Sequence, residues 1–140
     1  TEEIRRRGQR VGFRIESLDG IGAIMAHVDI SSRARVGRYG VDLEAIDRLV
    51  ERTLEDPDAE IVLLDEIGKM ECASQRFMSA VRALLEGPRI LVATIGLHGD
   101  GFIAQDKERS DVELWMVDSG NRNDMPRRVI EWIEATSEER

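Results

Sequence analysis

The spacing of hydrophobic residues changes along the chain, from a period of two near the start to a period near 3.6 further on. Residues 10–16 alternate apolar and polar positions, and a second apolar run covers residues 21–28. The turn residues 18–20 (Leu-Asp-Gly) lie between the two runs, which predicts a β-hairpin. Residues 29–41 have no clear period, and we expect a polar loop there.

Two stretches in the middle of the chain have the helical period and clear start signals. Asp42 and Ser74 are the expected N-caps, because each precedes an apolar stripe. Pro57 ends the first helix, and Gly87 with Pro88 ends the second. The stripes consist of Leu43, Ile46, Leu49, Val50 and Leu54, and of Phe77, Val81, Leu84 and Leu85.

Short continuous apolar runs predict strands buried on both faces at residues 61–64, 90–95 and 112–117. A Gly-rich loop and one or two helical turns are expected between the last two strands. A final helix is expected from Asp124 and Pro126 onward, with its inward residues Val129, Ile130 and Ile133. Strands alternating with amphipathic helices predict an α/β fold with a largely parallel sheet, to which the hairpin adds an antiparallel edge.

Composition narrows the class of protein. A length of 140 residues with 41% hydrophobic and 34% charged residues is typical of one globular domain. The net charge of -8 argues against general attraction to nucleic acid or to anionic membranes. The single Cys72 excludes an internal disulfide framework and favours a cytoplasmic location. No apolar run is long enough for a membrane span, so we expect no membrane partner.

Arginines cluster near the start of the chain, against the overall negative charge. They are Arg5, Arg6, Arg7, Arg10 and Arg14. A solvated basic face and a local anion site are both consistent with this cluster.

The segment IVLLDEIGKME, residues 61–71, contains the main candidate chemistry. Asp65 and Glu66 follow a buried strand, and in α/β sheets ligands bind at the carboxyl ends of the strands. An Asp in this position can bind Mg²⁺, and a neighbouring Glu can activate a water molecule. The alternative is structural, with Asp65 capping the next turn and Glu66 solvated.

The same segment resembles the DEIGKME motif of the cancer-related nucleoside-triphosphatase family, which consists of small P-loop proteins. Four further segments agree in the same order: TEEIRRRGQRVGFRI at 1–15, VGRYGVD at 36–42, ATI at 93–95 and GNRND at 120–124. The resemblance implies a P-loop NTPase-like three-layer α/β fold. It also implies a phosphate loop of the form G-x-x-x-x-G-K-[ST], which the 140 residues do not contain. We therefore expect residues 1–140 to form a single, N-terminally truncated domain without the first strand, the P-loop and the first helix.

The resemblance also implies roles for individual residues. Asp65 is expected to bind Mg²⁺, the implied cofactor, and Glu66 to activate water. Lys69 and Glu71 are expected to line the site, although an ion pair would equally explain Lys69. Glu3 is implied to lie in the segment that faces the phosphates, and Arg5 is a candidate for stabilising the transferred charge. Asn121 and Arg122 are implied to contact the base of the nucleotide. For Arg5 a plain surface role has equal weight, and Asn121 and Arg122 also suit a turn that leads into a helix.

The function implied for the intact protein is Mg²⁺-dependent hydrolysis of nucleoside triphosphates such as ATP and GTP to diphosphate and phosphate. A nucleotide or nucleoside kinase is the alternative with the same fold. A non-catalytic nucleotide-binding or protein-binding domain is the third possibility if the chain starts at Thr1. The preferred base and the oligomeric state do not follow from these residues.

Overall fold

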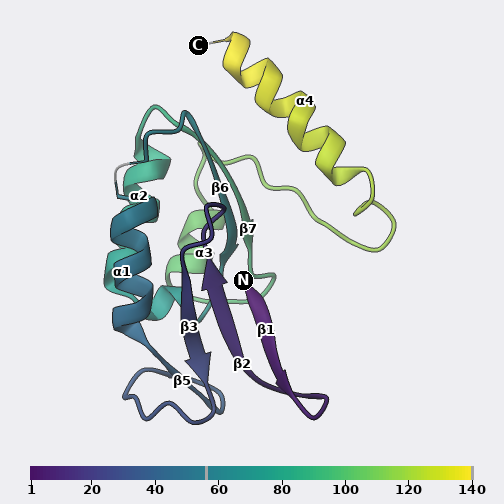
Figure 1. The fold of residues 1–140 in the computed structure, drawn as a ribbon. Helices are drawn as coiled ribbons and strands as arrows, with labels where there is room; N and C mark the ends of the chain where they lie inside the picture. The colour runs from purple at the N-terminus through teal and green to yellow at the C-terminus, as the bar shows by residue number, and fades with distance from the viewer. Residues whose placement is uncertain (56, 140) are drawn as a thin grey trace. The chain divides into compact units, whose positions relative to one another are not determined.

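The computed structural model describes residues 1–55 and 57–139, which form two compact units (Figure 1). The first unit covers residues 1–104 and the second covers residues 105–140. No helix among the described residues combines the length and the apolar character that crossing a membrane requires.

The first unit begins with a five-stranded antiparallel sheet in the order β1-β2-β3-β5-β4. Its strands are β1 (Glu2–Arg6), β2 (Gln9–Glu16), β3 (Gly22–His27), β4 (Arg35–Val36) and β5 (Tyr39–Val41). The predicted hairpin is confirmed, because β2 pairs with β3 around the turn at Leu18-Asp19-Gly20. The expected loop at 29–41 is wrong in part, since it contains the short β4–β5 hairpin.

The β1–β2 hairpin has no counterpart in the periodic pattern. Its turn is Arg7-Gly8, and both residues have positive φ, 51° for Arg7 and 79° for Gly8. That pair of left-handed conformations matches the twist of antiparallel strands, and glycine adopts it without strain.

Both predicted helices form with their predicted caps. α1 (Leu43–Thr53) begins at Asp42, whose side chain accepts a hydrogen bond from the Ala45 amide. α2 (Gln75–Glu86) begins at Ser74, whose hydroxyl oxygen accepts from the Phe77 amide. The two helices lie side by side, and α1 packs on β3 (Figure 1).

The parallel part of the fold is small. β6 (Ile61–Ile67) pairs with β7 (Ile90–Ile95) in parallel, and these two strands form a sheet of their own. The expectation of a largely parallel sheet is therefore wrong for the described residues, where most strand pairing is antiparallel. The core that joins the elements consists of buried residues from α1, α2, β3, β5 and β6, among them Met25, Val41, Ile46, Phe77 and Val81.

β6 is buried on one face rather than two. Val62 and Ile67 are buried, whereas Ile61 is 39% exposed and Leu63 is 58% exposed. Successive strand side chains point to opposite faces, and the described residues cover one of those faces. A continuous apolar run cannot by itself show which faces are covered.

The second unit begins within α3 (Phe102–Lys107), a helix that matches the expected helical turns. The predicted strand at 112–117 is wrong: these residues form no regular element. A strand needs a hydrogen-bonding neighbour, and none of the described strands pairs with this segment. α4 (Met125–Glu138) forms as predicted, but Ile130 is 56% exposed and does not lie inward.

Candidate active site

Asp65 and Glu66 lie at an irregularity in the β6–β7 ladder. Leu64 pairs with Ala93 and Ile67 pairs with Ile95, so the two acidic residues of β6 face the single residue Thr94 of β7. This two-against-one arrangement is a β-bulge, a feature often found beside active sites. The Thr94 hydroxyl donates a hydrogen bond of 2.5 Å to Asp65 Oδ1.

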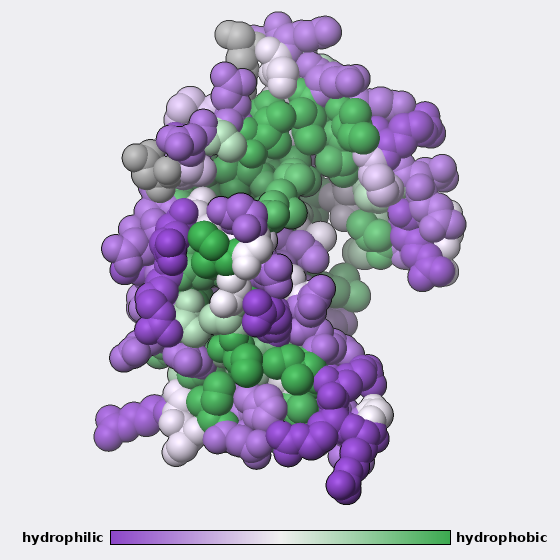
Figure 2. Space-filling view, viewed as in Figure 1, coloured by the Kyte–Doolittle hydropathy of each residue, from purple (hydrophilic) through white to green (hydrophobic). Residues whose placement is uncertain are grey.

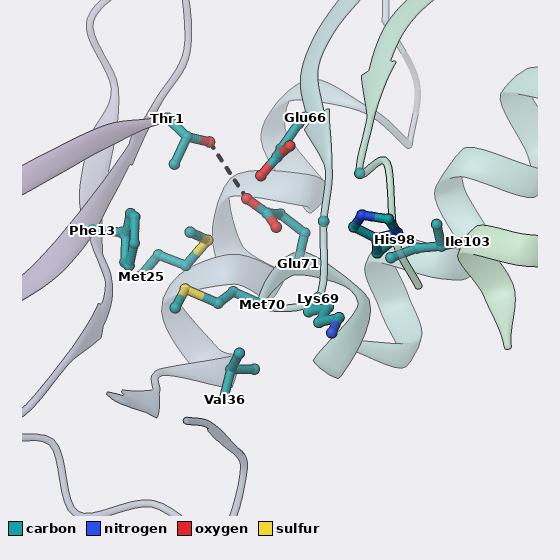
Figure 3. A pocket seen from close by; sticks show the side chains of 12 residues that line it. Thr1, Phe13, Met25, Val36, Glu66, Lys69, Met70, Glu71, His98 and Ile103 are labelled. Carbon is teal, nitrogen blue, oxygen red and sulfur yellow. Dashed lines mark hydrogen bonds between the residues drawn. The ribbon is translucent and has the colours of Figure 1, made fainter. Parts of the chain in front are cut away.

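A cavity of about 260 Å³ lies beside the bulge in the first unit. Figure 3 shows Thr1, Glu66 and Glu71 turned toward one another at this cavity, whereas the Lys69 ammonium group points away from the two carboxylates. Thr1 Oγ1 donates to the Asp65 carbonyl oxygen at 3.0 Å and to Glu71 Oε1 at 3.4 Å. Thr1, the residue before β1, is thereby hydrogen-bonded to the DEIGKME segment.

Glu71 is a buried carboxylate, with only 2% of its surface exposed. Burial raises the pKa of the Glu71 carboxyl above its ordinary value, and the neighbouring Glu66 charge raises it further. The hydrogen bond from Thr1 and the backbone hydrogen bond of Glu71 oppose this shift. Glu71 therefore differs from Glu66, which is exposed to solvent.

Gly68 provides the space in which the two glutamates meet. A Cβ atom at this position would lie 2.7 Å from Glu71 Oε2 and 2.9 Å from Glu66 Oε1. Both distances are shorter than van der Waals contact, so any larger residue would displace at least one carboxylate. The glycine of the DEIGKME segment is thus required by the site rather than by an unusual backbone angle.

Lys69 belongs to the DEIGKME segment, and Cys72 directly follows it. Lys69 is exposed at the edge of the cavity and makes no ion pair with any residue among 1–55 and 57–139. An ion pair therefore does not account for Lys69 in the part of the chain that is described. Cys72 is half-buried just after Glu71, in the 3-10 turn Glu71–Ala73.

Glu3 and Arg5 form an ion-pair group on β1 and do not line the cavity. The Arg5 guanidinium donates to Glu3 Oε2 through both Nε, at 3.0 Å, and a terminal nitrogen, at 2.6 Å. Arg10 donates to the other Glu3 oxygen at 2.9 Å. These contacts hold the pKa of the Glu3 carboxyl below its ordinary value, the Arg10 hydrogen bond contributing most.

Asn121 and Arg122 lie in the second unit, in the loop before α4. The Asn121 side chain donates to the Met116 carbonyl oxygen at 2.8 Å and accepts from the Asp118 amide at 2.9 Å. Its amide group therefore stabilises its own loop. These contacts agree with the turn alternative for Asn121, and they leave the predicted contact of Asn121 and Arg122 with a nucleotide base a prediction.

Sequence reasoning missed Thr94, Thr1 and His98. Thr94 is adjacent to Asp65 only because β6 and β7 pair, and its position at the end of an apolar strand was the available signal. His98 lines the cavity from the loop after β7. Thr1 reaches the cavity because β1, which the periodic pattern does not show, leads it there.

Comparison with known proteins supports the resemblance at the level of sequence. The family described as NTPase matches residues 1–130. The nucleoside-triphosphatase THEP1 of Thermotoga sp. (strain RQ2) is 36% identical over 132 residues, which cover 93% of this chain and 76% of that protein. The cancer-related nucleoside-triphosphatase of Homo sapiens is 30% identical, with 97% of this chain and 80% of the human protein covered.

Two solved structures extend the similarity to the fold. The crystal structure of THEP1 from Aquifex aeolicus has a TM-score of 0.78 at 27% identity, with 89% of this chain and 78% of that chain covered. The solution structure of the human enzyme has a TM-score of 0.77 at 31% identity, with 96% and 79% covered. The fold is therefore P-loop NTPase-like α/β. The chain belongs to the nucleoside-triphosphatase family that contains THEP1 and the human cancer-related enzyme.

Proposed function

We propose that this protein hydrolyses nucleoside triphosphates such as ATP and GTP to the diphosphate and phosphate, and that Mg²⁺ is required. The single observation that carries the proposal is the position of Asp65 and Glu66, two adjacent carboxylates at the carboxyl end of β6 and beside a cavity. Ligands of α/β folds bind at this end of the strands. The names of the relatives agree with this reaction class. We place the reaction in the cytoplasm as part of the same proposal.

The donor atoms near Asp65 suit a hard cation. Asp65 has a second carboxylate oxygen besides the one that accepts from Thr94, and the Thr94 hydroxyl is a further oxygen donor. The described residues contain no cluster of three or more His, Cys, Asp or Glu side chains suited to a metal. Mg²⁺ in nucleotide enzymes is commonly held by one or two protein oxygens together with waters and substrate phosphates, which fits this sparse set. When bound, it would neutralise charge on the phosphates.

Glu66 is the residue we assign to the attacking water. Its carboxylate is exposed and borders the cavity, so it can accept a proton as the water oxygen bonds to the γ-phosphorus. The bond between the γ-phosphorus and the bridging oxygen breaks, and the diphosphate leaves with the electron pair. Glu71 borders the same cavity, and burial together with the neighbouring Glu66 carboxylate raises the pKa of its carboxyl above the ordinary value.

Lys69 and Arg5 are the proposed cations for the phosphates. Lys69 has no ion-pair partner among the described residues, so its ammonium group can turn toward a bound anion. Arg5 would have to exchange its contacts with Glu3 for contacts with phosphate, which makes Glu3 a residue that controls its position. A base contact from Asn121 and Arg122 completes the proposal, with Glu71 lining the site.

Contacts to the triphosphate from a loop of the form G-x-x-x-x-G-K-[ST] are also part of this mechanism. The reading frame upstream of Thr1 should therefore be examined, and activity should be measured on its full product as well as on these 140 residues.

The decisive experiment measures phosphate release from ATP and GTP with and without Mg²⁺, using the wild type and Glu66→Gln. We expect a loss of 100-fold or more, roughly the contribution of a general base. Glu131→Gln, a change of the same kind on exposed α4, is the matched control. Unchanged turnover of Glu66→Gln would remove Glu66 from this role, and transfer of the γ-phosphate to a nucleoside would indicate a kinase.

A further inference from the structure

Charge is divided unevenly between the antiparallel sheet and the rest of the protein. Residues 1–41 contain eight arginines, no lysine and five acidic residues, a net charge of +3. The remaining 99 residues therefore have a net charge of -11, since the whole chain is at -8. Salt screens the interaction between charges that are more than about 8–10 Å apart. The distant acidic residues are therefore screened, and the field close to residues 1–41 can be positive although the whole protein is acidic.

Direct contacts gather arginines from several strands at one end of this sheet. Arg5 of β1 is paired with Arg10 of β2. The Arg38 guanidinium, from the turn between β4 and β5, donates a short hydrogen bond to the Arg10 carbonyl oxygen. Arg35 donates to the Arg38 carbonyl oxygen at 2.8 Å. We call this set the arginine end: Arg5, Arg6, Arg7, Arg10, Arg35 and Arg38.

The turn between β1 and β2 and the segment around β5 both lie at the lower end of the first unit in Figure 1. In Figure 2, hydrophilic residues project at this lower end on both sides of a small apolar area. The arginine end is therefore spread over two hairpins rather than enclosed in one pocket. An extended anion would contact it more fully than a single small one.

Carboxylates neutralise the arginine end only in part. Glu3 is shared by Arg5 and Arg10, and Asp29 contacts Arg6 at 3.3 Å. Arg7, Arg35 and Arg38 have no carboxylate partner among the described residues. Arginines elsewhere do pair with acids, for example Arg48, Arg76, Arg109 and Arg127.

Tyr39, a buried residue of β5, lies close to two guanidinium groups of the arginine end. The Arg38 guanidinium lies 5.3 Å from the centre of its ring and that of Arg10 lies 6.0 Å away. Hydrogen bonds from Arg10 and then Arg38 hold the pKa of the Tyr39 hydroxyl below its ordinary value. Packing on Tyr39 also fixes the two guanidinium groups, which reduces the entropy that they lose on binding.

The side chains at this end favour phosphate over a protein surface as the partner. Protein interfaces usually have an apolar centre, whereas the large apolar residues that are most exposed in the first unit lie outside residues 1–16 and 28–41. Nucleic-acid interfaces are polar and strongly positive, and arginine forks match phosphate oxygens. Two hairpins that carry arginines can follow successive phosphates of one backbone.

We propose that the arginine end binds the phosphate backbone of nucleic acid without sequence preference. None of its residues lines the cavity beside Glu66, and Arg5 is the one residue that it shares with the proposed hydrolysis. The variants that test the binding leave Arg5 in place. It refines the expectation from net charge alone: the chain as a whole repels nucleic acid, but this end attracts it. The interaction depends on salt, since phosphate contacts release counterions.

The test uses the purified 140-residue chain and a fluorescently labelled 20-base-pair DNA duplex, with anisotropy measured from 50 to 200 mM salt. We expect binding at 50 mM salt that weakens steeply as salt rises. The test variant is Arg7→Asn combined with Arg35→Gln. Asparagine suits the positive φ of Arg7, so the turn is retained.

The expected effect is a loss of at least about tenfold in affinity at 50 mM salt, and a salt slope smaller by about 1.8, from two lost contacts. Arg48→Gln combined with Arg127→Gln is the matched control. It removes the same charge from exposed helix positions and should leave binding unchanged. Thermal melting of both double variants checks that the fold is retained.

Three results would overturn the proposal. One is no binding of the duplex at 50 mM salt, and another is an equal loss in the control variant, which would show an effect of total charge. The third is tighter binding to vesicles rich in phosphatidylserine than to the duplex, which would assign the arginine end to a lipid surface.

Discussion

The Thr94 hydroxyl donates a 2.5 Å hydrogen bond to Asp65 Oδ1, across the only ladder that the carboxylate strand makes with another described strand. The bond fixes one carboxylate oxygen of Asp65, a residue that is exposed to solvent. It connects a residue of the DEIGKME segment to a threonine 29 positions away. The orientation of Asp65 therefore depends on the register of β6 and β7.

Replacing Thr94 by valine should weaken the proposed Mg²⁺ site more than the fold. Valine keeps the shape and the strand propensity of threonine but cannot donate to Asp65, which becomes freer to rotate. We expect about a tenfold or larger increase in the Mg²⁺ concentration required for activity, as is typical when a group that orients a metal ligand is lost. Magnesium titrations of phosphate release measure this. A variant with unchanged dependence on Mg²⁺ would show that Thr94 does not orient a metal ligand.

Gly68→Ala should disturb the site without straining the backbone. The added methyl group would meet Glu71 Oε2 and Glu66 Oε1 at 2.7 and 2.9 Å, so at least one carboxylate must move. We expect turnover to fall at least about tenfold, since small displacements of catalytic groups are costly. Steady-state kinetics measure the loss of turnover, and a melting curve shows whether the fold is destabilised. Normal kinetics in the folded variant would refute the idea that both carboxylates must converge on Gly68.

Glu71→Gln should change how stability depends on pH. The pKa of Glu71 is raised in the folded protein, so the folded state keeps a proton that the unfolded state loses as pH rises above about 4.5. The unfolded state then binds fewer protons, and the wild type loses stability until the raised pKa is passed. Glutamine cannot ionise and escapes this loss. Its stability relative to the wild type should therefore increase with pH.

Denaturant unfolding at a series of pH values from 4 to 8 measures that difference. Glu131→Gln provides the control for removal of one carboxylate from an exposed helix. A difference between Glu71→Gln and the wild type that stays constant across this range would show that folding does not raise the pKa of Glu71.

Val62 and Leu63, neighbours on β6, should lose different amounts of stability when each is truncated to alanine. Val62 is buried, and Val62→Ala should cost about 2 kcal/mol of stability through two lost methyl groups and the space that they leave. Leu63 is 58% exposed, so Leu63→Ala should cost less than about 1 kcal/mol although it removes more atoms. Chemical denaturation of the two variants tests the pair. A larger loss for Leu63→Ala would place the covered face of β6 on the other side.

Local signals predicted the helices and the β2–β3 hairpin of this fold, whereas long-range contacts determined the pairing and burial of the other strands. Asp42 and Ser74 act within three residues of themselves, so their caps could be identified from the sequence. The face of β6 that is covered depends on α1 and α2, and the state of residues 112–117 depends on a pairing partner. Neither is a property of the apolar run itself.

The candidate site divides in the same way. Asp65 and Glu66 were predicted from the strand that precedes them, and Lys69 and Glu71 from a resemblance that the family comparison supports. The contact from Thr94 and the burial of Glu71 come from packing between segments. Glu3 and Arg5 were expected near phosphate, whereas in this structure they contact each other and Arg10, which no spacing rule predicts.

The pairing of β6 with β7 also determines how their amide hydrogens should exchange with solvent deuterium. The Ile90 amide donates to the carbonyl oxygen of Glu60, just before β6, and the Gly96 amide donates to that of Ile67, the last residue of β6. Parallel strands alternate their donors between the two sides. Val92 and Thr94 should therefore be protected with them, whereas the amides of Leu91, Ala93 and Ile95 point to the edge where no described strand is paired. Protection factors along β7 should alternate with a period of two, so that one strand contains both slowly and rapidly exchanging amides.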